Sequence, residues 1–135
     1  MSKGTVLVVE DHFVASLEVE QALIAADYEV CAVARSEEAA LDLAAELAPD
    51  FAVVDIALDP GDGRVVAREM ARRGTAVLFV TGQCEEVASL SGAGALGCLP
   101  KPYDPDDVPA ALAAVEKLHR GLAPGALPDH MLLLT

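Results

Sequence analysis

Short apolar runs recur along the chain and alternate with segments of helical length. Each run has five to seven residues and is rich in Val, Ala or Leu. Apolar runs of this length, bounded by polar residues, Gly or Pro, are typical of buried strands. The pattern predicts five strands, at residues 5–10, 29–34, 51–55, 75–81 and 95–99.

Helical patterns fill the intervals between these runs. Phe13, Leu17 and Ile24 are spaced by four and seven residues, which predicts a helix with these three side chains on one face. A second helix is expected over residues 36–48, a segment rich in the good helix formers Ala, Leu and Glu, and Pro49 stops it.

Three more helices are expected in the second half of the chain. One covers residues 62–73, and a short, weakly patterned one covers 84–91. The last opens with Asp104 as N-cap and Pro105 as the first helical residue, an order that favours helix initiation. Its apolar stripe consists of Val108, Leu112 and Val115.

Strands that alternate with helices predict an α/β fold, with a parallel sheet covered by helices on both faces. Right-handed crossovers make such a sheet doubly wound, and ligands bind outside the carboxyl ends of its strands. We expect one domain over residues 1–120 and a short C-terminal tail over 121–135. The apolar end of the tail, Met131 to Leu134, is expected to dock on the domain or bind a partner rather than stay exposed.

Polar residues stand where the predicted strands end. Glu10 and Asp11 end the first strand, Asp55 the third and Thr81 the fourth, and Lys101 follows the fifth. Because parallel strands end at one edge of the sheet, these side chains should converge there. A lone buried carboxylate is costly, so Asp55 is expected at the mouth of a polar site.

Three clustered carboxylates repel one another and call for a divalent cation. An all-oxygen site suits Mg²⁺ better than Zn²⁺, which prefers nitrogen and sulfur ligands. A carboxylate beside Mg²⁺ can act as a nucleophile toward a phosphoryl group, whose charge a lysine can neutralise and whose oxygen a hydroxyl can bond. His12 adjoins the acidic pair and is expected at the surface, where it could perturb the site.

The excess of acidic over basic residues limits which kinds of partner the protein is expected to bind. The formal net charge is -13, which argues against nucleic acid, because phosphate contacts need clustered Lys and Arg. A basic protein or a cation is the more plausible partner. The apolar runs are shorter than the roughly 20 residues that span a bilayer, and the N-terminus lacks the apolar segment of a signal peptide, so we expect no membrane partner.

The three cysteines, Cys31, Cys84 and Cys98, are far apart in the sequence and form no CxxC pair. They suggest no disulfide framework, and the simplest interpretation is a reducing cytoplasm. Cys98 is expected to be a small core residue rather than a redox sensor, since free cysteines are commonly buried.

Four sequence pieces, in this order, resemble a response-regulator receiver domain of two-component signalling. They are VLVVED at 6–11, VVDIAL at 53–58, LFVTG at 78–82 and LPKPYD at 99–104, and the resemblance covers about residues 4 to 120. With no output domain in sight, the chain is similar to the stand-alone single-domain type. The FVTG run is similar to an alphaproteobacterial subgroup with an F-x-T-G motif.

This resemblance implies a flavodoxin-like sheet of order 2-1-3-4-5 with five helices, and a signalling protein rather than an enzyme acting on other substrates. Asp55 would accept the phosphoryl group from a histidine kinase or a histidine phosphotransfer protein, with Thr81 as the switch hydroxyl and Lys101 as the phosphoryl contact. The implied Mg²⁺ ligands are Glu10, Asp11, Asp55 and the backbone carbonyl of Ala57. Readout would be a protein–protein contact with an unknown downstream protein, a phosphorelay, or a homodimer.

Two departures from the family pattern matter. Cys98 stands where the family usually has Tyr or Phe, so the usual aromatic–threonine switch cannot operate in its standard form. The proline that usually comes four residues after the phosphoacceptor is replaced by Asp59, and Pro60 follows it.

These departures motivate a rival reading, a phosphorylation-independent pseudo-receiver that acts as a binding module. An aspartyl-phosphate phosphatase is a weaker rival, because the second acid it needs two residues after the nucleophile is Ala57 here. A nucleotide-binding Rossmann protein is weaker still, because the stretch 8–13 has no glycine-rich phosphate turn.

Overall fold

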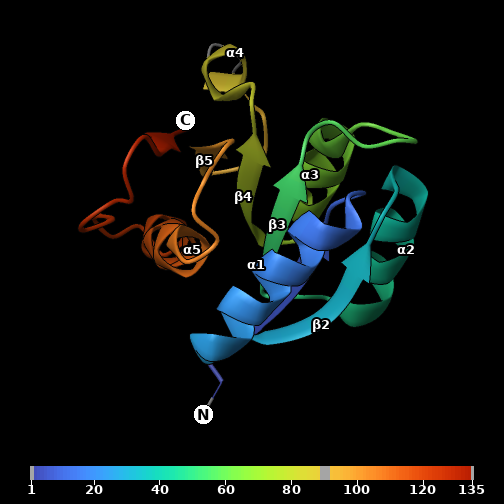
Figure 1. The fold of residues 1–135 in the computed structure, drawn as a ribbon, viewed down its shortest axis with the longest axis horizontal. Helices are drawn as coiled ribbons and strands as arrows, with labels where there is room; N and C mark the ends of the chain where they lie inside the picture. Colours follow the sequence, from blue (N-terminus) through green and yellow to red (C-terminus); the bar gives the residue numbers. More distant parts are fainter. Residues whose placement is uncertain (1, 89–91, 135) are drawn as a thin grey trace.

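The computed structural model describes residues 2–88 and 92–134, in which strands and helices alternate along the chain (Figure 1). The strands are β1 (Thr5–Val9), β2 (Glu29–Ala34), β3 (Phe51–Asp55), β4 (Ala76–Thr81), β5 (Gly97–Pro100) and β6 (Leu132–Leu133). The helices are α1 (Phe13–Ala25), α2 (Glu37–Leu47), α3 (Gly63–Arg72), α4 (Cys84–Ala88) and α5 (Asp107–His119). In the described ranges, no helix is long and apolar enough to cross a membrane.

The strands form one sheet of order β2-β1-β3-β4-β5-β6. The first five strands are parallel and have the order expected of a flavodoxin-like α/β fold. The prediction of five parallel strands is wrong in one respect, because the C-terminal tail adds β6 antiparallel to β5. Gly97 pairs with Leu133 and Cys98 with Leu132 in this added ladder.

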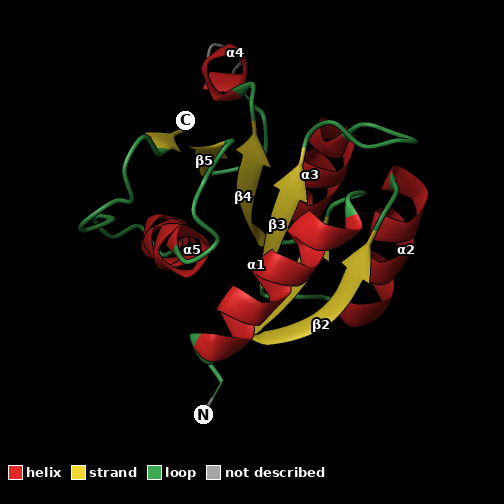
Figure 2. Cartoon of the chain, viewed as in Figure 1, coloured by secondary structure: helices red, strands yellow, loops and turns green. Residues whose placement is uncertain are grey.

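Helices cover the sheet on both faces, with α1 and α5 on one and α2 and α3 on the other (Figure 2). Alternation along β1 divides its side chains between the two layers, so that Val6 and Val8 pack under α1 and α5, whereas Leu7 and Val9 pack under α2 and α3. All residues of β3 and β4 are buried, as expected for central strands of a sheet that is covered twice.

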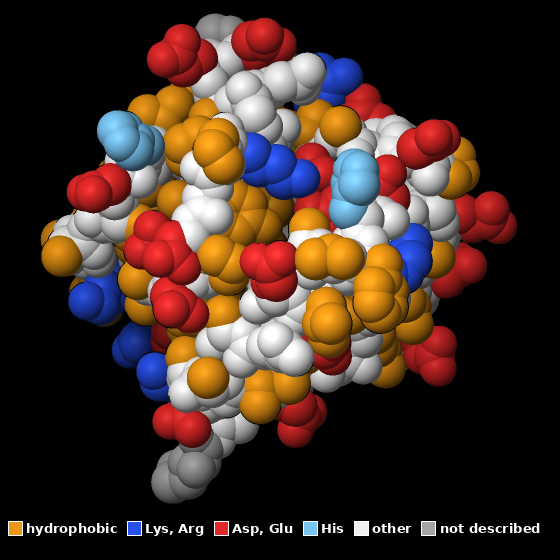
Figure 3. All heavy atoms as spheres, viewed as in Figure 1, with side chains coloured by type: hydrophobic (Ala, Val, Ile, Leu, Met, Phe, Trp, Pro, Cys, Tyr) orange, Lys and Arg blue, Asp and Glu red, His pale blue; other side chains and the backbone are white. Residues whose placement is uncertain are grey.

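The helix α1 forms as predicted, and the face that Phe13, Leu17 and Ile24 share points to solvent. Phe13, Leu17 and Ile24 are 64%, 38% and 55% exposed, whereas Val19 and Leu23 on the opposite side are 2% and 0% exposed. This helix is apolar around most of its circumference, so spacing alone does not identify the buried face. Figure 3 shows the resulting apolar side chains at the surface over α1, between acidic ones.

The expectation of no disulfide is also wrong, since Cys84 and Cys98 are bonded to each other and only Cys31 is free. The two residues lie 14 positions apart in the sequence. The fold brings the first residue of α4 over β5, and their Cα atoms are 5.7 Å apart. Three-dimensional proximity of this kind has no signature in cysteine spacing.

The starts and ends of two helices differ from the sequence expectation. The helix α5 begins at Asp107 with Asp106 as N-cap, not at Pro105, because Asp104 to Asp107 first form a turn closed by an Asp107 N–H to Asp104 C=O bond of 2.8 Å. The fourth helix, expected over 84–91, is α4, and the part of that prediction over 89–91 lies outside the described residues.

The apolar end of the tail docks on the domain, one of the alternatives that its composition left open. Met131 and Leu134 are buried, one in the layer under α5 and the other in the layer that contains Cys84. The Leu134 N–H also donates to the Leu96 carbonyl at 2.9 Å. The tail thus covers the edge of β5 that a five-stranded sheet would leave open.

Candidate functional site

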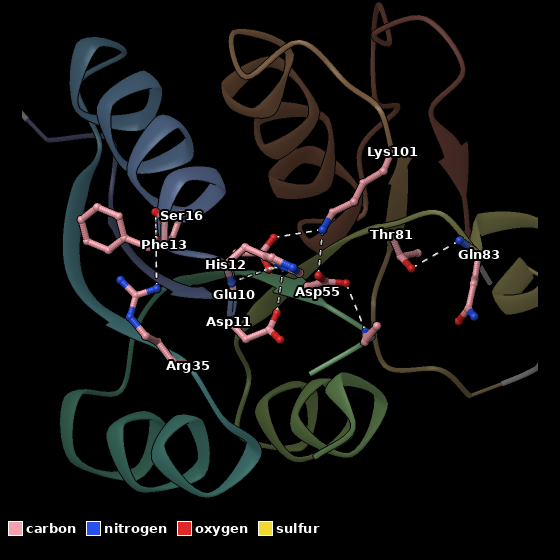
Figure 4. Close-up of polar contacts among 11 residues, drawn as sticks. Glu10, Asp11, His12, Phe13, Ser16, Arg35, Asp55, Thr81, Gln83 and Lys101 are labelled. Atoms are coloured by element: carbon pink, nitrogen blue, oxygen red, sulfur yellow. Dashed lines mark hydrogen bonds and ion pairs between the residues drawn. The ribbon is translucent and has the colours of Figure 1, made fainter. Parts of the chain in front are cut away.

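Five polar side chains lie at the carboxyl edge of the sheet, on or directly after strands β1, β3, β4 and β5. Glu10 and Asp11 follow β1, Asp55 ends β3, Thr81 ends β4 and Lys101 follows β5. Figure 4 shows that Glu10, Asp11, Asp55 and the end of Lys101 gather at one place, whereas Thr81 lies to one side, next to Gln83.

Lys101 joins two of the carboxylates. Its Nζ lies 3.0 Å from Oε1 of Glu10 and 2.8 Å from Oδ2 of Asp55. The two carboxylate side chains are 2% and 4% exposed, so they depend on this partner, while the lysine side chain is 30% exposed and keeps contact with water. One cation thus balances two buried anions, and the cluster keeps an excess of negative charge.

Burial and charge shift the titration of this cluster. Burial raises the pKa of Glu10, and the nearby Asp55 charge raises it further, against the lowering effect of the Lys101 hydrogen bond. Burial alone would lower the pKa of Lys101, but its hydrogen bonds to Asp55 and Glu10 outweigh that effect and raise it. The lysine is therefore held in its charged form.

Asp11 is the third carboxylate of the cluster, and one of its oxygens accepts no hydrogen bond from the described residues. Its Oδ1 is buried and makes no hydrogen bond within the described part of the chain. The nearest basic group is Nδ1 of His12, 3.2 Å away on a side chain that is 74% exposed. Single ligand atoms from Glu10, Asp11, His12 and Asp55 all lie within 4.8 Å of one another.

This donor set fits Mg²⁺. Three carboxylates supply hard oxygen ligands, and Asp11, one of whose oxygens accepts no hydrogen bond from the described residues, offers one of the ligand atoms that lie within 4.8 Å of one another. His12 belongs to the same cluster, which its position next to Glu10 and Asp11 indicated, but its imidazole nitrogen suits Mg²⁺ less well than the oxygens do.

The loop after β3 is held close to Asp55. The Ala57 N–H donates to Oδ1 of Asp55 at 3.1 Å, so Ala57 lies beside the cluster; its carbonyl as a metal ligand stays a prediction. The loop returns at Gly63, whose N–H donates to the Ile56 carbonyl at 2.8 Å. A Cβ atom at Gly63 would lie 2.1 Å from the Asp55 carbonyl oxygen, so only glycine permits this close approach.

Thr81 is buried in the turn between β4 and α4. Its Oγ1 accepts a hydrogen bond from the Gln83 N–H at 3.3 Å, and its carbonyl accepts one from the Lys101 N–H at 2.9 Å. The second bond ties the end of β4 to the lysine that contacts Asp55. Of the five polar residues, Thr81 is the one whose side chain makes no hydrogen bond to the carboxylate cluster within the described part of the chain.

A hollow of about 570 Å³ opens beside the cluster, and His12, Lys101 and Tyr103 are among the residues that line it. Burial raises the pKa of Tyr103 to about 12, so its phenol stays neutral at ordinary pH. A cavity of about 640 Å³ lies at the opposite edge of the sheet, next to Lys3 and Phe51, and is lined by neither Lys101 nor His12. The smaller hollow is therefore the one that matches the site.

The fold and the site agree with the comparison to known families. The family model described as "Response regulator receiver domain" matches residues 6–113, and the chain therefore belongs to the response regulator receiver domains of two-component signalling. These are generally signalling domains, and the match indicates no enzyme family. No curated protein matches the sequence.

Solved structures share the fold at low sequence identity. The receiver domain of PhyR from Erythrobacter litoralis is 19% identical with a TM-score of 0.75, over 86% of this chain and 92% of that one. Chemotaxis response regulator CheY4 of Vibrio cholerae is 25% identical with a TM-score of 0.72, over 85% and 98%. PhyR from Bartonella quintana, titled an anti-anti-sigma factor, is 21% identical with a TM-score of 0.73, over 90% of this chain and 50% of that one.

Proposed function

We propose that this chain is a Mg²⁺-dependent phosphoryl acceptor that takes the phosphoryl group on Asp55. The observation that carries the proposal is the contact of Lys101 Nζ with Asp55 Oδ2 and Glu10 Oε1, next to a buried Asp11 oxygen that accepts no hydrogen bond from the described residues. A structural ion pair needs no third, unsatisfied carboxylate beside it. A site that binds a cation before a phosphoryl group uses a further carboxylate as a ligand of that cation.

The chain's own residues divide the work. An Asp55 oxygen attacks the phosphorus of a phosphohistidine, the oxygen–phosphorus bond forms, and the nitrogen–phosphorus bond breaks. Lys101 exchanges its bond to the Asp55 carboxylate for a phosphoryl oxygen, and the Thr81 hydroxyl donates to another. Mg²⁺, held by Glu10, Asp11, Asp55 and the Ala57 carbonyl, would neutralise charge on the transferred group.

The donor in this proposal is a histidine kinase or a histidine phosphotransfer protein, as is general for the family. The signal then passes by a changed protein–protein contact or by relay, in the cytoplasm, from a domain over residues 1–120 whose tail is 121–135. A net charge of -13 supports a protein rather than a nucleic acid as the partner.

Intact-protein mass spectrometry after incubation with acetyl phosphate and Mg²⁺ tests the proposal. We expect a mass gain of one phosphoryl group that is lost with EDTA or with Asp55→Asn. Asp59→Asn, which removes an exposed carboxylate from the neighbouring loop, is the matched control and should keep the gain.

The pseudo-receiver remains the second candidate, because Cys98 is bonded to Cys84 and no aromatic side chain occupies its position on β5. No phosphoryl gain, no response to beryllofluoride and an unchanged melting temperature with Mg²⁺ would together favour it over the proposal. The phosphatase rival predicts turnover of a phosphorylated substrate by the wild type, which we do not expect.

A further inference from the structure

The Cys84–Cys98 pair joins the helix α4 to the strand β5. Cys84 is the first residue of α4, and Cys98 lies within β5, where it pairs with Phe79 of β4 on one side and with Leu132 of β6 on the other. The Cα separation of 5.7 Å is in the ordinary range for a bonded pair. The bond therefore ties α4 to the sheet at its core.

The same two residues also fit as free thiols. Sγ of Cys84 lies 3.7 Å from the Thr81 carbonyl oxygen, a distance at which a thiol can donate a hydrogen bond. Both residues are buried among apolar side chains, at 3% and 0% exposure, where a free thiol packs as a small apolar group. Neither redox form places a strongly polar group in this apolar layer.

The disulfide is a large part of what anchors α4. In its described residues this five-residue helix buries only two side chains, those of Cys84 and Val87. Without the covalent bond, the buried anchors among the described residues of α4 would be the Val87 side chain and the Cys84 thiol. Because few of these described side chains are buried, we expect α4 to open often enough to admit an oxidant or a reductant to the sulfurs.

The position of the bond relates it to the phosphoacceptor site. Cys84 comes three residues after Thr81, and the Gln83 N–H between them holds the Thr81 hydroxyl at 3.3 Å. With Cys84 fixed to β5, both ends of this turn are fixed, one by the strand and one by the disulfide. A shift of the Thr81 backbone toward a phosphoryl group on Asp55 would then have to work against the disulfide at the other end of the turn.

We propose that Cys84 and Cys98 form a thiol–disulfide modification site whose oxidised form slows phosphorylation, an inference that rests on the proposed function. The oxidant is a low-molecular-weight disulfide such as glutathione disulfide. One cysteine thiolate attacks a sulfur of the oxidant and releases one glutathione thiolate; the second cysteine then attacks the mixed disulfide and releases the other. One S–S bond forms as one breaks, and the two protons leaving the cysteines end on two glutathione molecules.

Alkylation under denaturing conditions measures the redox state directly. After equilibration in glutathione buffers of graded ratio, we expect the number of alkylated thiols per chain to pass from three to one as the buffer becomes oxidising, with the chain monomeric throughout. Cys31→Ser is the matched control, because Cys31 is the free cysteine, and should pass from two to none. Three reactive thiols at every ratio would overturn the proposal.

Phosphorylation of the two redox forms with acetyl phosphate and Mg²⁺ then tests the coupling. The oxidised wild type should react at least fivefold more slowly than the reduced wild type, and Cys31→Ser should keep this difference. Cys84→Ser and Cys98→Ser should react at the reduced rate under both conditions. The wild-type comparison remains decisive if either variant fails to fold.

The outcomes separate this inference from the function on which it rests. Equal, measurable rates in both wild-type forms would overturn the redox control and leave Asp55 as a phosphoacceptor. No phosphorylation in either form, with both forms folded and their thiol counts different, would overturn the phosphoacceptor and with it the control.

Discussion

The acidic site and the α4–β5–β6 region lie at the same end of one sheet, yet different forces hold them together. The acidic site consists of charged side chains supplied one at a time by strand ends, with Lys101 shared between Glu10 and Asp55. The α4–β5–β6 region is held by a covalent bond, a two-residue ladder and buried apolar side chains. The first region brings like charges together at some cost in stability, and the second stabilises the fold.

The largest effect on stability is expected from the tail. Replacing Met131 and Leu134 together by Ala should lower the free energy of unfolding by about 4 kcal/mol, because each truncation of a buried side chain of this size costs about 2 kcal/mol or more. Urea denaturation measures the loss. Leu127→Ala, at an exposed position of the same tail, is the control and should change little. A change below 1 kcal/mol in the double variant would show that the tail is not part of the folded unit.

The next effect is expected from the cation of the acidic site. Lys101→Met should lower the free energy of unfolding in EDTA by about 1 to 3 kcal/mol, because Glu10 and Asp55 lose their common hydrogen-bond donor. Mg²⁺ should recover part of this loss. The exposed Lys117→Met serves as the control, and equal stability of the two variants in EDTA would contradict the balance of charge described for the site.

The smallest effect should have the opposite sign. Asp11→Asn removes one charge from a cluster that has more acid than base, so in EDTA it should raise the free energy of unfolding by up to about 1 kcal/mol. The same variant should lose most of the stabilisation that Mg²⁺ gives the wild type. Thermal melts with EDTA or Mg²⁺ measure both quantities. A variant that is destabilised in EDTA would mean that Asp11 contributes to the fold rather than to a cation site.

The two regions also differ in how much the sequence predicts. The observed strands β1 to β5 start and end within two residues of the predicted ones, because continuous apolar runs identify buried strands well. The convergence of Glu10, Asp55 and Lys101 follows from strand order and direction alone. These features are local in sequence or follow from the strand order, so the pattern of apolar and polar residues predicts them.

The features that were missed depend on contacts between distant segments. The bond between Cys84 and Cys98 requires α4 to lie over β5, and no spacing rule contains that information. The helical spacing of Phe13 and Ile24 places them on one face of α1 but does not say that this face meets solvent while Val19 and Leu23 face the sheet. In both cases the sequence does not show which surface of a helix or strand packs against its neighbour.

The sixth strand has a consequence for association. An open strand edge offers unpaired backbone groups to other chains and promotes aggregation. Here β6 covers the β5 edge, with its two residues paired to Gly97 and Cys98, and the remaining edge strand is β2, which starts at the exposed Glu29. The C-terminal tail thus pairs with one edge of the sheet. Another molecule can therefore pair with β5 only after β6 has dissociated from it.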